Sequence, residues 1–183
     1  SSYIYLNYYY VKFDDVSVKD IAYENGCEMK VIATIGKSDV DYLNPNYDIA
    51  KEVDWDEDIE LFSSYDCPLM LVDEFIVDGY DWKLTSKILS QINDTGSLSG
   101  LVTAFPSKTT DLLNDNIDTD LFAFYMIPYN SLSYMMDISA FNKAQRQEFI
   151  QKVVNLNKKI IASRVFAVGV LKPQDSFEFF NRF

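Results

Sequence analysis

The stretch "PLMLVDEFIVDGYDWKLTSKILSQINDTGSLSGLVTAFP", Pro68–Pro106, decides the fold class because it contains strand, helix and strand in succession. It opens with an apolar run that is typical of a buried strand or hairpin. Asp81 is a suitable N-cap for a helix, since apolar residues then recur every four positions until Gly96 ends the pattern. The closing segment "LVTAFP" is again predicted to be a strand.

The same alternation continues on both sides of this stretch. Downstream, "TTDLLNDNI" predicts a short helix and "LFAFYMIP" a strand, followed by a long helix over residues 140–164 and a last strand at "VFAVGVLK". Asn142 and Gln145 form a possible capping box at the start of the long helix. Upstream, "YIYLNYYYVKF" and "CEMKVIATIG" are rich in strand-forming residues. Helices and strands in this order predict an α/β or α+β fold.

A chain of 183 residues fits one domain. We therefore expect a single layered domain over residues 1–183, with helices packed on a central mixed sheet. The apolar positions of the two longest predicted helices should face the sheet. The core is predicted to contain Leu84, Ile88, Ile92, Val153, Val154 and Ile161.

Charge is concentrated in one part of the sequence. Residues 39–81 contain fourteen acidic residues and one basic residue, whereas residues 121–183 contain eight basic and four acidic ones, in a chain of net charge −12. The densest run is "EVDWDEDIE", Glu52–Glu60, in which six carboxylates surround one tryptophan. Together with Asn44-Pro45-Asn46, this run predicts an irregular, acidic loop-rich excursion over residues 37–66. Such asymmetry indicates a surface that selects its partner by the sign of its charge.

Several kinds of chemistry are excluded by composition. The chain has no histidine, so Ser-His-Asp and Cys-His catalytic sets and histidine-containing zinc sites cannot form within it. Neither a P-loop nor a Gly-x-Gly-x-x-Gly motif is present. The acidic run fails as an EF-hand loop, because Ile59 and Tyr65 stand where glycine and a bidentate glutamate are required. We therefore expect no metal site, no catalytic residue and no cofactor.

One short motif carries an enzymatic alternative. Glu28-Met29-Lys30 lies on a predicted strand, 13 to 14 residues after Asp14 and Asp15. This pattern resembles the Asp…(Asp/Glu)-x-Lys core of the restriction-endonuclease-like family. The resemblance implies a metal-dependent nuclease in which the carboxylates hold Mg²⁺ and the lysine helps to activate water. A net charge of −12 opposes this alternative, because it repels a nucleic-acid substrate.

The favoured hypothesis is a non-enzymatic protein–protein interaction subunit, a structural or assembly component such as that of a phage or virus particle. Its partners would be proteins, including copies of itself in a ring or particle, and neither nucleic acid nor membrane. Tryptophan as anchor and carboxylates as the selective rim are typical of interface hot spots. The predicted partner-binding residues are Asp54, Trp55, Asp56, Glu57, Asp58 and Glu60.

A second hypothesis uses the same acidic surface differently. An acidic inhibitor, such as a nuclease-toxin immunity protein or a DNA-mimicking anti-defence protein, would occupy a basic active site with these carboxylates. The N-terminal stretch lacks the basic start and continuous apolar run of a signal peptide. The two cysteines, Cys27 and Cys67, give no disulfide framework and fit a reducing compartment. Both hypotheses therefore place the protein in the cytoplasm, of a host cell or within a virion if it is viral.

Overall fold

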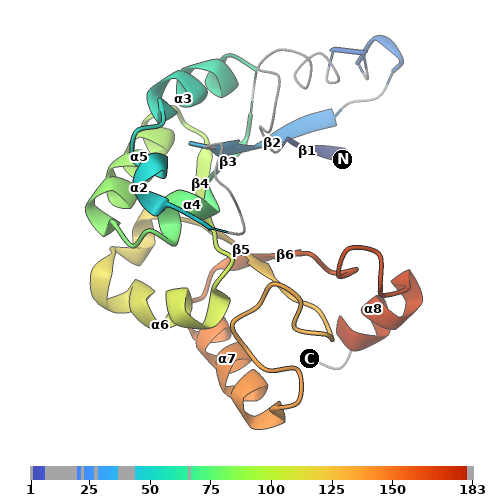
Figure 1. Ribbon diagram of the computed structural model, residues 1–183. Coiled ribbons are helices and arrows are strands. Elements are labelled where there is room, and N and C mark those ends of the chain that lie inside the picture. Colours follow the sequence, from blue (N-terminus) through green and yellow to red (C-terminus); the bar gives the residue numbers. More distant parts are fainter. Residues whose placement is uncertain are drawn as a thin grey trace.

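The computed structural model describes residues 2–6, 20–21, 23–26, 29–36, 44–65 and 67–180. The α/β prediction is confirmed: helices surround a curled sheet of six strands (Figure 1). The strands are β1 (Ser2–Leu6), β2 (Met29–Ile35), β3 (Leu69–Val72), β4 (Leu98–Val102), β5 (Phe124–Pro128) and β6 (Lys159–Ser163). The helices are α2 (Tyr47–Ala50), α3 (Trp55–Ser64), α4 (Glu74–Val77), α5 (Trp82–Asp94), α6 (Pro106–Asn116), the 3₁₀ turn η1 (Thr119–Leu121), α7 (Lys143–Asn155) and α8 (Pro173–Phe180).

The strands lie side by side in the order in which they occur in the sequence, and each described pair is parallel. Crossovers between parallel strands are almost always right-handed, so a sequential order directs every crossover to the same face of the sheet. Figure 1 shows α3, α5, α6 and α7 following one another along this face, which we call the outer face. The same sequential order builds the closed (β/α)₈ barrel. Here β1 and β6 each pair with a single described strand and are edges.

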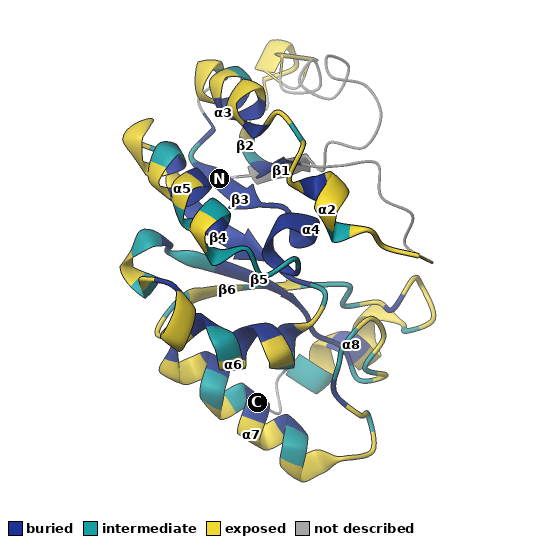
Figure 2. Cartoon of the chain, turned by 60° about the vertical axis from the view of Figure 1, so that its left-hand side comes forward, coloured by how far each residue is buried: buried dark blue, intermediate teal, exposed yellow. Residues whose placement is uncertain are grey.

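The main core lies between the outer face and the helices. Strand side chains alternate, so Val31, Ala33 and Ile35 of β2 point to this side together with Tyr125 and Ile127 of β5. The helices contribute their apolar stripes, among them Phe62, Ile88, Leu89, Ile92, Phe149 and Val153. In Figure 2 the strands are largely dark blue and the helices show yellow on their outward sides, as expected of amphipathic helices on a buried sheet.

The inner face of the sheet is also apolar. Leu69, Leu71, Val102 and Met126 are buried there. Gly100 of β4 lies among them and has no room for a side chain, because a Cβ atom would lie 2.5 Å from Leu71 Cδ2 and 2.6 Å from the carbonyl oxygen of Phe124. The inner side of a curled sheet is its crowded side, and glycine permits the neighbouring strands to approach.

Several predictions about local structure are confirmed. The carboxylate of Asp81 accepts a hydrogen bond from Leu84 N at 3.0 Å and begins α5, and Thr95 and Gly96 end it. Asn142 begins α7 by accepting from Gln145 N at 3.0 Å. Of the predicted core residues, Ile88, Ile92 and Val153 are buried, and Leu84 and Ile161 are partly buried.

Other predictions are wrong. The described pairs are all parallel, where a mixed sheet was expected. The helix over residues 140–164 is α7, which ends at Asn155, and Ile161 belongs to strand β6 because Asn157 turns the chain with φ 53°. "VFAVGVLK" forms turns instead of a strand. Val154 is exposed. The described part of the acidic excursion over residues 37–66 is mostly helical, comprising α2 and α3.

Neighbouring valines of α7 test this helix register. Val153 is 6% exposed and Val154 is 62% exposed. Val153→Asp places an unpaired charge in the core and should lower the free energy of unfolding by at least about 3 kcal/mol. Val154→Asp is the matched control and should change it by less than about 0.5 kcal/mol. Urea unfolding followed by circular dichroism measures both, and equal effects of the two substitutions would contradict the register.

Candidate functional site

The predicted partner-binding segment forms helix α3 rather than a loop. Asp54 is its N-cap and accepts a hydrogen bond from Glu57 N at 3.1 Å. Acidic residues in the first turn of a helix are stabilised by the positive end of the helix dipole, which explains why such a charged run is helical. The helix turns Trp55, Asp58 and Ile59 toward the sheet.

Trp55 lies in the core, and its predicted role as an exposed anchor is therefore wrong. Its side chain is 7% exposed and packs in the main core, where its Cβ atom approaches Gly36. Lys87 of α5 covers the ring with Nζ 4.7 Å from its centroid. The indole reaches the interior because the helical period places it on the same face as Ile59 and Phe62. It stabilises the packing of α3 on the sheet.

Asp58 is also unavailable to a partner. It is buried, and its Oδ2 atom accepts a hydrogen bond from Gly36 N at 2.8 Å. Gly36 follows β2 with a positive φ of 79°, so this bond fixes α3 against the turn at the end of that strand. A charge-assisted bond of this kind is among the stronger ones in proteins.

The other carboxylates of this region remain on the surface. Residues 44–65 contain seven acidic residues and one lysine, and Lys51 pairs only with its helical neighbour Asp48 at 2.9 Å. Asp56 accepts a hydrogen bond from Gln91 at 3.0 Å across to α5. We call the exposed acidic side chains of this region the acidic end: Asp48, Glu52, Asp54, Asp56, Glu57 and Glu60.

A surface of opposite charge lies at the other end of the sheet. Residues 143–180, which include α7, β6 and α8, contain seven basic and three acidic residues. Lys152 pairs with Asp111 at 2.8 Å and with Glu148 at 3.0 Å, and Arg146 is buried. The remaining exposed lysines of this region form what we call the basic end: Lys143, Lys159 and Lys172. Figure 1 places α3 at the top of the molecule and α7 at the bottom.

A further polar group, which the sequence did not reveal, lies where the parallel strands end. Arg164, directly after β6, donates from one nitrogen to both carboxylate oxygens of Glu74 at 2.8 and 3.1 Å. Glu74 begins α4, directly after Asp73 at the end of β3. The pair connects two strand ends ninety residues apart. The carboxyl ends of strands are where parallel α/β folds usually bind ligands.

Asp78 is the centre of a second buried network at this edge. Its two oxygens accept hydrogen bonds from the hydroxyl groups of Thr103 and Thr109 and from Ala104 N, at 2.5, 3.1 and 2.8 Å. Burial raises the pKa of Asp78 to about 6, although these hydrogen bonds act to lower it. The network fastens α4 to the turn after β4 and satisfies the carboxylate within the protein.

The small cavity beside these carboxylates does not suffice for a ligand site. It has a volume of about 70 Å³, and Tyr47, Glu74, Asp78 and Phe105 contribute to its walls. Ligand pockets typically measure about 300–1,000 Å³. Among the residues that the structure describes, no group of three or more acidic or cysteine side chains is arranged to hold a metal ion. Asp14, Asp15 and Glu28, the residues of the nuclease alternative, lie outside the described residues, and Lys30 is on β2.

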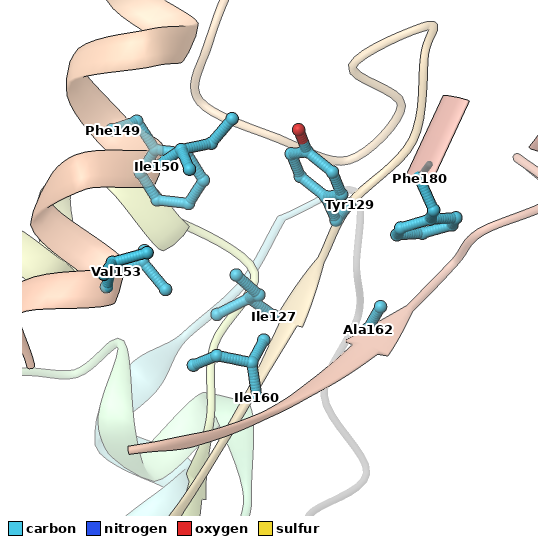
Figure 3. A pocket seen from close by; sticks show the side chains of 9 residues that line it. Ile127, Tyr129, Phe149, Ile150, Val153, Ile160, Ala162 and Phe180 are labelled. Atoms are coloured by element: carbon cyan, nitrogen blue, oxygen red, sulfur yellow. The ribbon is translucent and has the colours of Figure 1, made fainter. Parts of the chain in front are cut away.

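A larger hollow lies on the outer face beside β6, and we call it the groove. Its volume is about 360 Å³. Figure 3 shows side chains of α7, β5 and β6 pointing into it, with Phe180 of α8 at its rim. The lining is apolar apart from the hydroxyl of one tyrosine and consists of Ile127, Tyr129, Phe149, Ile150, Val153, Val154, Ile160, Ala162 and Phe180.

Comparison with known proteins gives no relative: no family model matches the chain, and no curated protein matches it significantly. In the described ranges no helix is both long and apolar enough to cross a bilayer.

The placement of Trp55 can be measured through stability. Trp55→Ala should lower the free energy of unfolding by about 3–5 kcal/mol, because it removes a large side chain from a packed core. Glu60→Ala, in the same helix but exposed, should change it by less than about 0.5 kcal/mol. Chemical denaturation measures both variants. A Trp55→Ala protein as stable as the parent would return the tryptophan to the surface.

The buried Asp78 should make stability depend on pH in an unusual direction. Its folded pKa lies above the ordinary value of 3.8, so the folded state binds the proton more tightly than the unfolded state does. The carboxyl group should therefore destabilise the fold progressively as the pH rises from 3.8 through about 6. The full cost at neutral pH is roughly 3 kcal/mol.

Asp78→Asn isolates this contribution, because the amide does not titrate. The free energy of unfolding of the parent minus that of the variant should fall by up to roughly 3 kcal/mol between about pH 4 and pH 7. Denaturation at a series of pH values measures the difference, in which the other carboxylates cancel. A difference that is constant or that rises with pH would show that burial does not control this group.

Proposed function

We propose that the protein is a non-enzymatic protein–protein interaction subunit, a structural or assembly component that associates head to tail with further copies of itself. In such an assembly the acidic end of one copy binds the basic end of the next. The observation that supports this proposal is the separation of charge along the sheet. The acidic end lies beside β2 and the basic end beside β6, at opposite ends of one rigid layer.

This arrangement favours one kind of symmetry. Two different, complementary surfaces on one molecule form heterologous contacts, which close into rings or continue as filaments. A two-fold contact would instead place each surface against itself, and like charges would then repel one another. The charges therefore select the orientation of the neighbouring copy.

The carboxylates that are available to a partner differ from those predicted by position alone. Asp58 is satisfied inside the protein, whereas Glu52 and Glu60 are exposed. Exposed charges chiefly accelerate association and make it sensitive to salt, because their field extends only about 10 Å at 0.1 M ionic strength. An apolar contact must supply most of the affinity.

Sedimentation velocity at low and high salt tests the proposal. The protein should associate in about 20 mM NaCl and dissociate toward monomers in about 500 mM NaCl, where the charges are screened. Glu52→Lys combined with Glu60→Lys should weaken association at low salt about tenfold or more, since it reverses two charges of the acidic end.

Asp94→Lys combined with Asp115→Lys is the matched control, because it makes the same change of net charge at exposed positions of α5 and α6. It should leave association nearly unchanged. If both double variants weaken association equally, net charge and not the acidic end is responsible. A protein that remains monomeric at low salt and high concentration refutes self-assembly and favours the inhibitor hypothesis.

A further inference from the structure

The groove beside β6 is an uncovered part of the outer face. Val154 and Ile160 of its lining are 62% and 42% exposed. Elsewhere on this face helices cover the strands, with α3 packed on β2 and α5 packed on β3 and β4. Exposed apolar side chains that surround a hollow are typical of interaction surfaces.

The crossover rule explains why the groove is open. Each helix of a sequential parallel sheet lies over the outer face between the strand before it and the strand after it. A helix over the free side of β6 would therefore be followed by a strand beyond β6, and no described strand occupies that position. Helix α8 follows β6 but covers the groove only with Phe180. The groove thus has the shape and position of a seat for a crossover helix.

A matching apolar surface lies at the opposite end of the sheet. Between β1 and β2 the described residues include a helical turn, in which Ile21 and Tyr23 are 55% and 73% exposed. This turn belongs to the β1–β2 crossover, so the same rule places it on the outer face. Two large apolar side chains thus protrude at one end of the layer, and an empty apolar groove lies at the other.

We propose that the groove of one copy receives the helical turn with Ile21 and Tyr23 from a second copy of this chain. The inference rests on the proposed head-to-tail association and names the contact that supplies its affinity. A copy placed in this way brings β1 beside β6 with the same strand direction, as a continued parallel sheet requires. A two-fold arrangement of β6 against β6 would reverse one of the strands.

Charge complementarity supports the same occupant. Asp20 and Glu24 flank the protruding side chains and are exposed. Lys158 and Lys159 lie at the start of β6, directly before Ile160 of the groove. The other strongly exposed apolar residues, among them Phe141, Val168 and Phe177, belong to the end of the chain that forms the groove, where a head-to-tail neighbour cannot use them as the complementary surface.

Two variants on opposite sides of the contact test the inference. Val154→Asp alters the groove, and Ile21→Ser combined with Tyr23→Ser alters the protruding turn. Each should weaken self-association at low salt about tenfold or more, measured by sedimentation, without changing the unfolding transition of the monomer. Combining them should add little further weakening, because both remove the same contact. Phe141→Ser is the control, since this residue is 96% exposed and lies outside the groove.

The outcomes separate this contact from the association itself. If the acidic-end variant of the proposed function dissociates the assembly while the groove and turn variants associate like the parent, the groove contact is wrong and head-to-tail association stands. If the effects of the groove and turn variants add fully, the two surfaces bind different sites and the inference is also wrong. A parent protein that is monomeric under every condition refutes both.

Discussion

The handedness of the crossovers is the constraint on which the rest of this structure depends. Because the six strands follow the chain order and all described pairs are parallel, right-handed crossovers place the helices on one face. This geometry leaves two different edges, β1 and β6, and gives the layer a beginning and an end. The acidic helix α3 follows the second strand and the basic helix α7 precedes the sixth. The order of charges in the sequence therefore becomes a separation of charges in space.

Carboxylates serve two separate purposes in this fold. Asp58, Glu74 and Asp78 are buried, and each binds a backbone or side-chain donor that connects two elements. Such bonds position α3 and α4 at the carboxyl ends of the strands and leave the bound oxygens satisfied by the protein. The exposed carboxylates of α2 and α3 make few contacts and determine the field outside the molecule instead. A uniform acidic patch in the sequence is thus divided by the helical period into fixed and available groups.

The sequence predicts elements well where the apolar period is clear. Helix α5, its Asp81 cap and the strands on either side follow directly from their patterns. The acidic run was misassigned, because its charges conceal the four-residue spacing of Trp55, Ile59 and Phe62, which is the helical signal. Ile160 and Ile161 continue the apparent stripe of α7, and only the turn at Asn157 assigns them to β6.

Long-range contacts could not be predicted from the sequence. The bond between Arg164 and Glu74 joins residues ninety positions apart, and it depends on which strands are neighbours. Nothing in the local pattern distinguishes Asp58, which is buried, from the adjacent Glu57, which is exposed, until the face of α3 is known. The groove is likewise a property of the sheet edge: its lining comes from four separate elements, and each of them reads locally as ordinary core.

Head-to-tail association between different surfaces is the central claim, and a mixing experiment tests it most directly. One variant carries Glu52→Lys and Glu60→Lys and keeps its groove, and the other carries Val154→Asp and keeps its acidic end. In sedimentation at low salt each variant alone should be a monomer, whereas their equimolar mixture should form a dimer of one copy of each, because one intact pair of surfaces remains. A mixture that stays monomeric, or variants that assemble alone as the parent does, would contradict the account.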